Sequence, residues 1–494
     1  MSVLFLLLLP VIVPILGGVF VLIVRFRDPV ARRVYVGAVV VVNMILSLLA
    51  IFIAPKGRIV TLIPFTERYG IALRLDGMAV LFGFILCTLW VIATFYSFEY
   101  MKHEGRENKF FAFYTMSFGI AMGLAFSANM LTFYLFYELL TLGTLPLVMH
   151  AMDPQARFAG KKYIVYSIGG AAFAFIAMVF MLYYGSTLDF TFGGVFLADA
   201  IAGREQWLLV VFVLAFFGFG VKAAVFPLSG WLPTAGVAPT PVTALLHAVA
   251  VVNAGVYALV RLIYYTFGAG FLIGTWAQYT VMAAALVTIV YGSAMALRTP
   301  HLKRRLAYST VSNLSYMVFG LTLMTPAGMV GGLTHMVVHS VLKILAFFCV
   351  GAILYKTHKE YVYEINGFGR KMPVTMAAFT VSAIGLMGIP PLPGFLSKWN
   401  LGTAAVQSGN PLAYAGIGVL ILSTLLTALY MMQIVFKAYF PNKEMDVEAL
   451  TQGVKDPNLF MTVPFVLLAA AAVALGIYHA PLLEMFGYIA RGLF

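Results

Sequence analysis

The chain has 494 residues, of which 62% are hydrophobic and only 10% are charged. Soluble proteins carry about a quarter charged residues, so this composition excludes an ordinary soluble enzyme and is typical of a protein that crosses a membrane many times. The formal net charge of +13 does not indicate nucleic-acid binding, because the basic residues are spread over short connections between apolar runs.

The N-terminal stretch MSVLFLLLLPVIVPILGGVFVLIV has no basic segment before its apolar run. The run continues past about 20 residues, which predicts a retained membrane span rather than a cleaved signal peptide. The cysteines, Cys87 and Cys349, lie far apart inside apolar runs. They predict neither a disulfide framework nor a metal site.

Apolar runs of about 20 residues, the length that crosses a bilayer, recur along the chain. The seventh run ends at FPLSGWLP and the twelfth is split by GIPPLPG, so we expect both helices to be broken. The pattern predicts an all-α polytopic membrane protein, a single transmembrane domain over residues 1–494 without a soluble domain. We expect about fourteen transmembrane helices, at 3–24, 34–53, 78–100, 110–127, 130–151, 163–184, 207–228, 241–265, 272–297, 305–323, 331–354, 373–408, 411–437 and 460–482.

Basic residues gather in the odd-numbered connections between these runs. Of the 31 Lys and Arg residues, 21 lie in odd connections and five in even ones. Cytoplasmic loops carry an excess of Lys and Arg, so we expect the basic loops in the cytoplasm, both termini outside and the protein in the cell (plasma) membrane. The odd set lies at 25–33, 102–109, 157–162, 298–305, 356–371 and 437–455, and the even set at 56–74 and 204.

A few ionisable residues remain inside the runs, where a charge costs about 2.5–3.5 kcal/mol on insertion scales. Lys222 and Lys398 stand next to the predicted breaks. For these two lysines, extension of the side chain to the lipid headgroups is an alternative interpretation. Lys343 and Glu138 lie about two turns or more from either helix end, which favours a functional role. The full set is Glu138, Lys222, His247, His335, His339, Lys343 and Lys398.

The segment LTHMVVHSVLKILAFF places three of these residues, His335, His339 and Lys343, four positions apart. Such spacing puts them on one helical stripe. Histidine titrates near neutrality, so a row that ends in a lysine can pass protons by way of water. A single buried histidine is more often structural, and a metal site would need a third ligand, which no nearby carboxylate or cysteine supplies.

Lys222 precedes the first break and Lys398 follows the second, five helices later. Transporters place ion sites at such breaks, in paired halves of the chain. The pattern predicts two related five-helix units, 110–266 and 271–438. The 109 N-terminal residues would hold helices 1–3, and 460–494 the last helix. Two ordinary proline kinks are the alternative.

No Walker loop, dinucleotide fingerprint or CxxC pair occurs in the chain. We therefore expect no cofactor and no active site of its own. Energy would come from an ion gradient or a partner.

Five motifs in order carry a resemblance to a known family: YELLTLGTLPLV, GFGVKAAVFPLSGWLPTAGVAPTPVTALLHAVAVVNAGVYALVR, LKRRLAYSTVSNLSYM, LTHMVVHSVLKILAFF and GIPPLPGFLSKW. From about Asp76 to Tyr439 the chain resembles the antiporter-like subunit family. This family includes the L, M and N subunits of respiratory complex I, the A and D subunits of Mrp-type Na+/H+ antiporters, and the matching subunits of membrane-bound hydrogenases.

The resemblance implies a fourteen-helix fold with two inverted five-helix repeats and a hydrated proton-carrying axis. Matched by motif, Glu138 is the acidic residue of helix five and Lys222 its partner on broken helix seven, and the two would form a switchable ion pair. His247 would be a relay histidine, and Lys398 the terminal residue on broken helix twelve. The helix-eleven ladder would be His335, His339 and Lys343.

The sequence departs from the family pattern in places. Asn253 stands where many members carry a helix-eight lysine, and His301 where an aspartate is common. The chain ends at Phe494, so it would lack the long lateral helix of L-type subunits and resemble the D or M kind. Some M-type subunits carry Glu at the position of Lys398, and the chain resembles those subunits less.

The function expected is proton translocation by an antiporter-like member of a multisubunit complex, alongside other membrane subunits in the lipid bilayer. The complex could be an Mrp-type cation/proton antiporter or a redox-driven complex I or hydrogenase relative, and whether Na+ moves as well as H+ is open. The alternatives are a stand-alone transporter of a small solute, a quinone-binding redox protein, and a structural subunit with a relic axis.

Overall fold

The computed structural model describes residues 2–66, 69–441, 448 and 451–493. Arg68 and Lys443, two of the basic connection residues, lie outside these ranges. Within them the chain is largely helical, as the sequence predicts, and 10 helices are long and apolar enough to cross a membrane. These candidate spans are α1 (Val3–Val24), α2 (Pro29–Ile53), α3 (Gly77–Tyr100), α5 (Met130–Val148), α6 (Pro154–Tyr184), the Thr240–Phe267 run, α13 (Trp276–Arg298), α15 (Pro326–Thr357), α19 (Pro411–Tyr439) and α21 (Leu459–Ile477).

The other expected spans are occupied by helices that are shorter or more polar: α4 (Glu107–Ala125), α8 (Glu205–Gly220), α14 (Leu302–Thr322), and the pair α17 (Pro373–Met387) and α18 (Pro393–Gln407). The antiparallel strands β1 (Ile59–Pro64) and β2 (Gly70–Arg74) form a hairpin between α2 and α3. The remaining helices are α7 (Ala198–Ile201), α9 (Trp231–Ala235), α12 (Ala269–Leu272), α16 (Phe368–Lys371), η2 (Val362–Glu364) and α22 (Ala480–Ala490).

Short polar side chains begin many of these helices. Asp28, Asn129 and Asp153 each accept hydrogen bonds from backbone N–H groups in the first turn that follows them. The first turn of a helix has no internal partners for its N–H groups, so these caps satisfy donors that would otherwise be left unpaired. Each cap also determines where the chain enters its apolar helix.

Breaks lie at both places where the sequence predicts them. α8 ends at Gly220, and α9 begins only at Trp231. α17 ends at Met387, where Gly388 adopts φ 83°, a left-handed conformation that suits glycine. At these points backbone groups leave the helical hydrogen-bonding pattern, and such groups persist at membrane depth only inside protein or beside a cavity.

The segment 241–265, expected as one helix, is divided. α10 (Thr240–Ala248) ends before α11 (Val251–Val260), and a π-helix (Arg261–Phe267) follows. The physical reason is visible at Leu245, whose carbonyl oxygen accepts hydrogen bonds from the N–H groups of both Val249 and Ala250. That shared acceptor inserts one residue into the turn.

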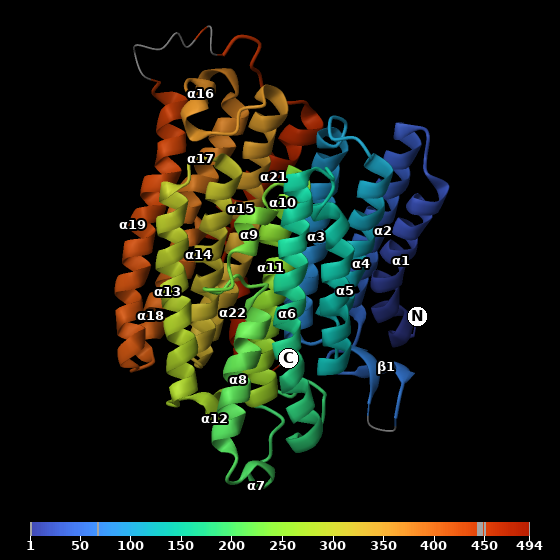
Figure 1. The fold of residues 1–494 in the computed structure, drawn as a ribbon, viewed down its shortest axis with the longest axis vertical. Coiled ribbons are helices and arrows are strands. Elements are labelled where there is room, and N and C mark those ends of the chain that lie inside the picture. The colour runs from blue at the N-terminus through green and yellow to red at the C-terminus, as the bar shows by residue number, and fades with distance from the viewer. Residues whose placement is uncertain (1, 67–68, 442–447, 449–450, 494) are drawn as a thin grey trace.

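The helices that carry most of the polar ladder lie at the centre of the bundle. Within an apolar stretch of 18 residues in each span, 94% of the residues of α15 and 100% of those of the Thr240–Phe267 run are buried. The corresponding shares are 33% for α2 and 28% for α21. Figure 1 shows α15 and α11 within the bundle and α1, α2 and α19 on its flanks. His335, His339 and Lys343 on α15 are buried and therefore face other helices rather than lipid.

Candidate functional site

Lys222 lies in the turn that follows α8 and is fully buried. Its ammonium donates a hydrogen bond to the backbone carbonyl oxygen of Tyr137 and sits 3.4 Å from the centroid of the Tyr137 ring. Both contacts stabilise a cation away from water. The hydroxyl of Tyr137 in turn donates to the Phe219 carbonyl oxygen at 3.1 Å, which ties α5 to the end of α8.

Glu138, the next residue on α5, is half-buried. Its Oε1 is shielded from solvent and accepts no hydrogen bond from any described residue. Glu138 and Lys222 do not form an ion pair in this structure, where the described ion pairs involve other residues. The carboxylate and the ammonium flank the same residue, Tyr137, so the arrangement corresponds to a separated pair.

Gly255 of α11 determines how closely the central helices approach Lys222. A Cβ atom at Gly255 would lie 2.3 Å from the backbone nitrogen of Ala223 and 2.7 Å from the carbonyl carbon of Lys222. Real Cβ atoms do not come so close, so only glycine permits this contact. α11 therefore packs directly on the backbone of the break.

His247 and His339 meet between α10 and α15. Nε2 of His339 lies 3.2 Å from the backbone oxygen of His247. Neither ring nitrogen of His247 hydrogen-bonds to a described residue, and its ring packs 5.2 Å from that of Phe347. The His247 ring is fully buried, and a buried polar group without a partner among the described residues is uncommon in proteins.

Asn253 bridges the same two helical segments. Its amide nitrogen donates to the Ala248 carbonyl oxygen at 3.0 Å and to the Ser340 hydroxyl at 2.8 Å. Asn253 thus spans the gap between α10 and α11 and fastens it to α15. A neutral amide here stabilises the division of the central helix without adding a charge.

His335 links the ladder to broken helix α18. Its Nδ1 lies 2.9 Å from the Ser397 hydroxyl, and its Nε2 lies 3.2 Å from the side-chain oxygen of Asn313. The His335 and His339 rings are stacked with centroids 6.4 Å apart. The predicted face of α15 is therefore continuous from one histidine to the other, and it continues into α18 one residue before Lys398.

Lys343 is fully buried and has hydroxyl and carbonyl partners instead of a carboxylate. Its ammonium donates to the Ser309 hydroxyl at 2.5 Å and lies 3.5 Å from the Leu306 carbonyl oxygen. The Ser309 hydroxyl lies 2.7 Å from that of Tyr430, which donates to Thr427 at 3.1 Å. Three helices, α14, α15 and α19, supply this hydroxyl chain.

Lys398 closes the second break. Its ammonium donates to the carbonyl oxygens of Leu386 and Met387, each at 2.9 Å, and to the Thr424 hydroxyl at 3.1 Å. These carbonyls belong to the last turn of α17, where helical partners are missing. A cation at a helix C-terminus is also favoured by the helix dipole, so Lys398 stabilises the break that it faces.

The geometry divides the expected residues into groups. Glu138 and Lys222 gather around Tyr137. His339 and His335 lie on α15, the backbone of His247 on α10 contacts His339, and Ser397 connects His335 to the Lys398 end. No described hydrogen bond joins Lys222 to His247, and Gly255 of α11 packs against the backbone at Lys222.

A model of the NADH:quinone oxidoreductase/Mrp antiporter transmembrane family matches residues 127–429, more than half of the chain. The chain belongs to this family. NADH-quinone oxidoreductase subunit N of Desulforudis audaxviator (strain MP104C) is 30% identical over 430 residues, which cover 84% of each chain. This protein is thus an antiporter-like membrane subunit.

A second relative in the family is a probable K(+)/H(+) antiporter subunit of Rhizobium meliloti (strain 1021). It is 27% identical over 95% of this chain, and the match spans 47% of that longer relative. The structure of the Mrp complex from Dietzia sp. DQ12-45-1b contains a chain with the same fold. That chain superposes with a TM-score of 0.86 at 21% identity, over 100% of this chain and 98% of the other.

The sequence did not predict several polar side chains that lie next to the predicted lysines and histidines. Ser309, Asn313 and Ser397 contact predicted lysines and histidines directly, and Tyr430 contacts Ser309. Ser309 and Asn313 stand four residues apart within LKRRLAYSTVSNLSYM, a spacing that puts both on one face of α14. That spacing was the available signal.

Arg261 is the other residue that sequence reasoning passed over, because it falls near the end of an expected span. It is 1% exposed and forms a bidentate contact with Asp76, at 2.7 and 2.9 Å. Tyr257 and Arg74 complete this ionic cluster at the start of α3. Its buried charges are paired, as buried charges must be.

His301, the other departure from the family pattern, lies outside the spans, at the start of α14. Its Nε2 is 3.4 Å from Oε2 of Glu360. Burial lowers the pKa of His301, and Glu360 opposes that effect only in part. His301 therefore contacts an acidic neighbour, but its lowered pKa keeps the ring neutral to a lower pH than that of a histidine in water.

Proposed function

We propose that the chain moves protons along the line from Glu138 and Lys222, through His247, His339 and His335 beside Lys343, to Lys398. The observation that carries this proposal is the run of contacts from His247 to Ser397, buried in the centre of the bundle. Each member can hold or release a proton. The burial of the line excludes a merely solvated row of charges.

We also propose the finer architecture: fourteen spans, with 110–266 and 271–438 as inverted five-helix repeats. Helices α4–α11 and α13–α19 occupy these ranges, and each range contains one lysine at a break. Residues 1–109 would add helices 1–3, and 460–494 the last helix. Figure 1 shows the β1 hairpin and α7, which belong to even connections, at one end and α16, from an odd connection, at the other. This separation supports basic loops in the cytoplasm of a plasma-membrane protein, with both termini outside.

The mechanism rests on two positions of the Glu138–Lys222 pair. With the pair closed, the carboxylate stabilises the charge on Lys222. In the separated arrangement described above, the ammonium contacts the carbonyl oxygen and the ring of Tyr137, and the carboxylate of Glu138 acts on it without a direct contact. A weaker counter-charge in a buried site favours release of the proton, which would then pass inward toward His247.

The test is proton uptake in membrane vesicles that contain the complete complex, followed with a pH-sensitive dye. Glu138→Gln and Lys222→Ala should each reduce uptake at least about tenfold, as for loss of a positioned acid or base. Glu205→Gln and Lys161→Ala, which change exposed residues of the same types, are the matched controls. Unchanged uptake in both Glu138→Gln and Lys222→Ala would refute the path, and with it a mechanism through these residues.

We further propose that the chain works as one subunit beside other membrane subunits, since the named relatives are subunits of multisubunit proteins. Purification in mild detergent and mass spectrometry of the co-purifying chains identifies the complex. Subunits with iron–sulfur clusters, flavin or nickel would make it a redox-driven pump. Small hydrophobic subunits alone would make it an Mrp-type antiporter, and uptake with and without a Na+ gradient then tests for the second ion.

A further inference from the structure

A cavity of about 610 Å³ lies between α6, α9 and the α13–α14 connection. None of the residues of the proposed proton path lines it. Its polar walls come from the first turns of α6 and α14 and the end of α13. These are the ends of the helices that carry the basic odd connections. The cavity is lined by Pro154, Gln155, Phe158, Pro233, Thr234, Val237, Thr299, Arg304 and Tyr308.

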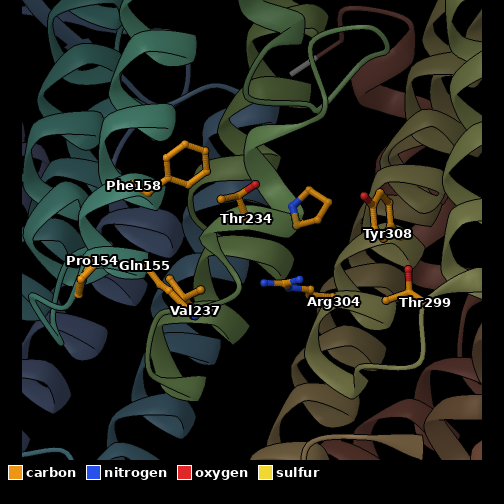
Figure 2. Close-up of a pocket in the computed structure, with 9 residues that line it drawn as sticks. Pro154, Gln155, Phe158, Thr234, Val237, Thr299, Arg304 and Tyr308 are labelled. Carbon is orange, nitrogen blue, oxygen red and sulfur yellow. The ribbon is translucent and has the colours of Figure 1, made fainter.

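Arg304 differs from the basic residues on either side of it. Lys303 is buried and donates to the Ala238 carbonyl oxygen at 2.7 Å, and Arg305 is held by the carbonyl oxygens of Thr299 and Tyr430. Arg304 is exposed, and among the described residues none forms a hydrogen bond or ion pair with its guanidinium. Figure 2 shows this side chain extending from α14 across the cavity toward Val237.

A second cation supports the same wall of the cavity. The ammonium of Lys162 donates to the Thr234 hydroxyl at 3.1 Å, and Thr234 lines the cavity. Arg304 thus lines the cavity itself, and Lys162 places a second positive charge behind the Thr234 side of it. Gln155 and Tyr308 add an amide and a phenol that can donate hydrogen bonds.

The polar and apolar parts of the cavity are separated along the helices. Figure 2 shows Arg304 at the level of Gln155 and Thr299, with Phe158 and Tyr308 displaced to one side. Phe158 is 62% exposed, and Val165, which is 68% exposed, lies two turns farther along the same side of α6. Lys161 and Lys162 lie between them on that side. The cavity therefore borders a surface of α6 on which exposed apolar side chains alternate with lysines.

We propose that this cavity is a binding site for one anionic phospholipid. Arg304 would bind the phosphate bidentately with help from Gln155 and Tyr308, and an acyl chain would lie along Phe158 and Val165. Basic pockets between transmembrane helices bind acidic headgroups, and arginine suits the geometry of phosphate. The exposed Phe158 and Val165 favour a lipid over an acidic peptide, which would leave these apolar side chains uncovered. The proposal does not depend on the proton path.

The test is native mass spectrometry of the full chain, as purified with its complex, titrated with phosphatidylglycerol. Arg304→Gln should weaken binding of one lipid about fivefold, the effect of one basic residue near a phospholipid surface. Arg304→Lys should weaken it less, since charge remains but the bidentate geometry is lost. Lys371→Gln, an exposed change on α16 outside the cavity, should leave binding unchanged, and phosphatidylcholine should bind more weakly to the unaltered chain.

Other outcomes would overturn the proposal. Equal effects of Arg304→Gln and Lys371→Gln would show that no specific site exists. Competition by glycerol phosphate as strong as by intact phosphatidylglycerol would make the site one for a soluble phosphate. A photoreactive residue in place of Phe158 should capture lipid in native membranes, and capture of another protein chain would assign the cavity to a neighbouring protein of the complex.

Discussion

The ammonium of Lys343 lies 2.5 Å from the hydroxyl of Ser309, which comes from a different helix. A lysine bound to a hydroxyl can lose its proton without leaving an unpaired carboxylate behind. The same hydroxyl lies 2.7 Å from that of Tyr430. Lys343 is thus linked through neutral groups to α19, a connection that a view of α15 by itself does not reveal.

Ser309→Ala should reduce proton uptake about tenfold, because a hydrogen bond to a charged group contributes about 1.5–3 kcal/mol. Tyr430→Phe leaves the contact between Ser309 and Lys343 in place and removes the hydrogen bonds of the Tyr430 hydroxyl to Ser309 and Thr427. Its effect on uptake should therefore be smaller. Uptake in vesicles gives both values. Ser293→Ala is the matched control, since Ser293 joins a buried hydroxyl cluster with Ser312 and Ser423. Equal uptake rates in Ser309→Ala, Tyr430→Phe and Ser293→Ala would show that the contact between Ser309 and Lys343 has no part in transport.

Gly255→Ala should disturb Lys222 without touching its side chain. The added methyl would meet the Lys222 and Ala223 backbone, and overpacking costs about 1–3 kcal/mol. We expect a lower midpoint of thermal unfolding together with reduced proton uptake. Gly169→Ala is the control, because a Cβ at Gly169 meets nothing within 4 Å and alanine favours a helix. If both variants behave like the unaltered chain, the close packing at the break is not required.

Asp76→Asn should destabilise the protein by about 3–5 kcal/mol, because it leaves the buried guanidinium of Arg261 without its counter-charge. The check is thermal unfolding in detergent. Lys102→Ala breaks a more exposed pair with Glu99, in which Lys102 is 37% exposed, and should cost at most about 1 kcal/mol. Comparable losses in the two variants would contradict the structural role of the Asp76–Arg261 pair.

His301 should make stability depend on pH. Burial lowers its pKa, Glu360 opposes this shift, and Lys303 and Arg304 add to it. The unfolded chain then binds the proton more readily than the folded one. Stability should be fully present above the ordinary histidine pKa of about 6.5 and should fall as the pH drops toward the lowered value.

The measurement is the midpoint of thermal unfolding between about pH 7.5 and about pH 5.5, the range in which histidines titrate. His301→Gln should make this dependence shallower. His103→Gln, which changes an exposed histidine, should leave it as it is. An unchanged slope in His301→Gln would assign the pH dependence to other groups.

Much of the line of ionisable residues can be predicted from the sequence. His335, His339 and Lys343 repeat every four residues inside an apolar run, and in a helix that spacing places them on one face. Proline and glycine in FPLSGWLP and GIPPLPG predict the breaks at α8 and α17, because these residues interrupt helical hydrogen bonding. The roles of Glu138, Lys222 and Lys398 in transport stay predictions.

The sequence by itself therefore determined the class of protein, the position of most helices and the face of α15 that is polar, because hydropathy and periodicity are properties of one segment at a time. Only the tertiary structure decided that Ser309 meets Lys343 and Tyr430, that Arg261 meets Asp76, and that the Oε1 atom of Glu138 accepts no hydrogen bond from Lys222. Such contacts depend on how each helix is rotated and tilted against its neighbours. That packing follows from side chains that interlock between segments far apart in the chain.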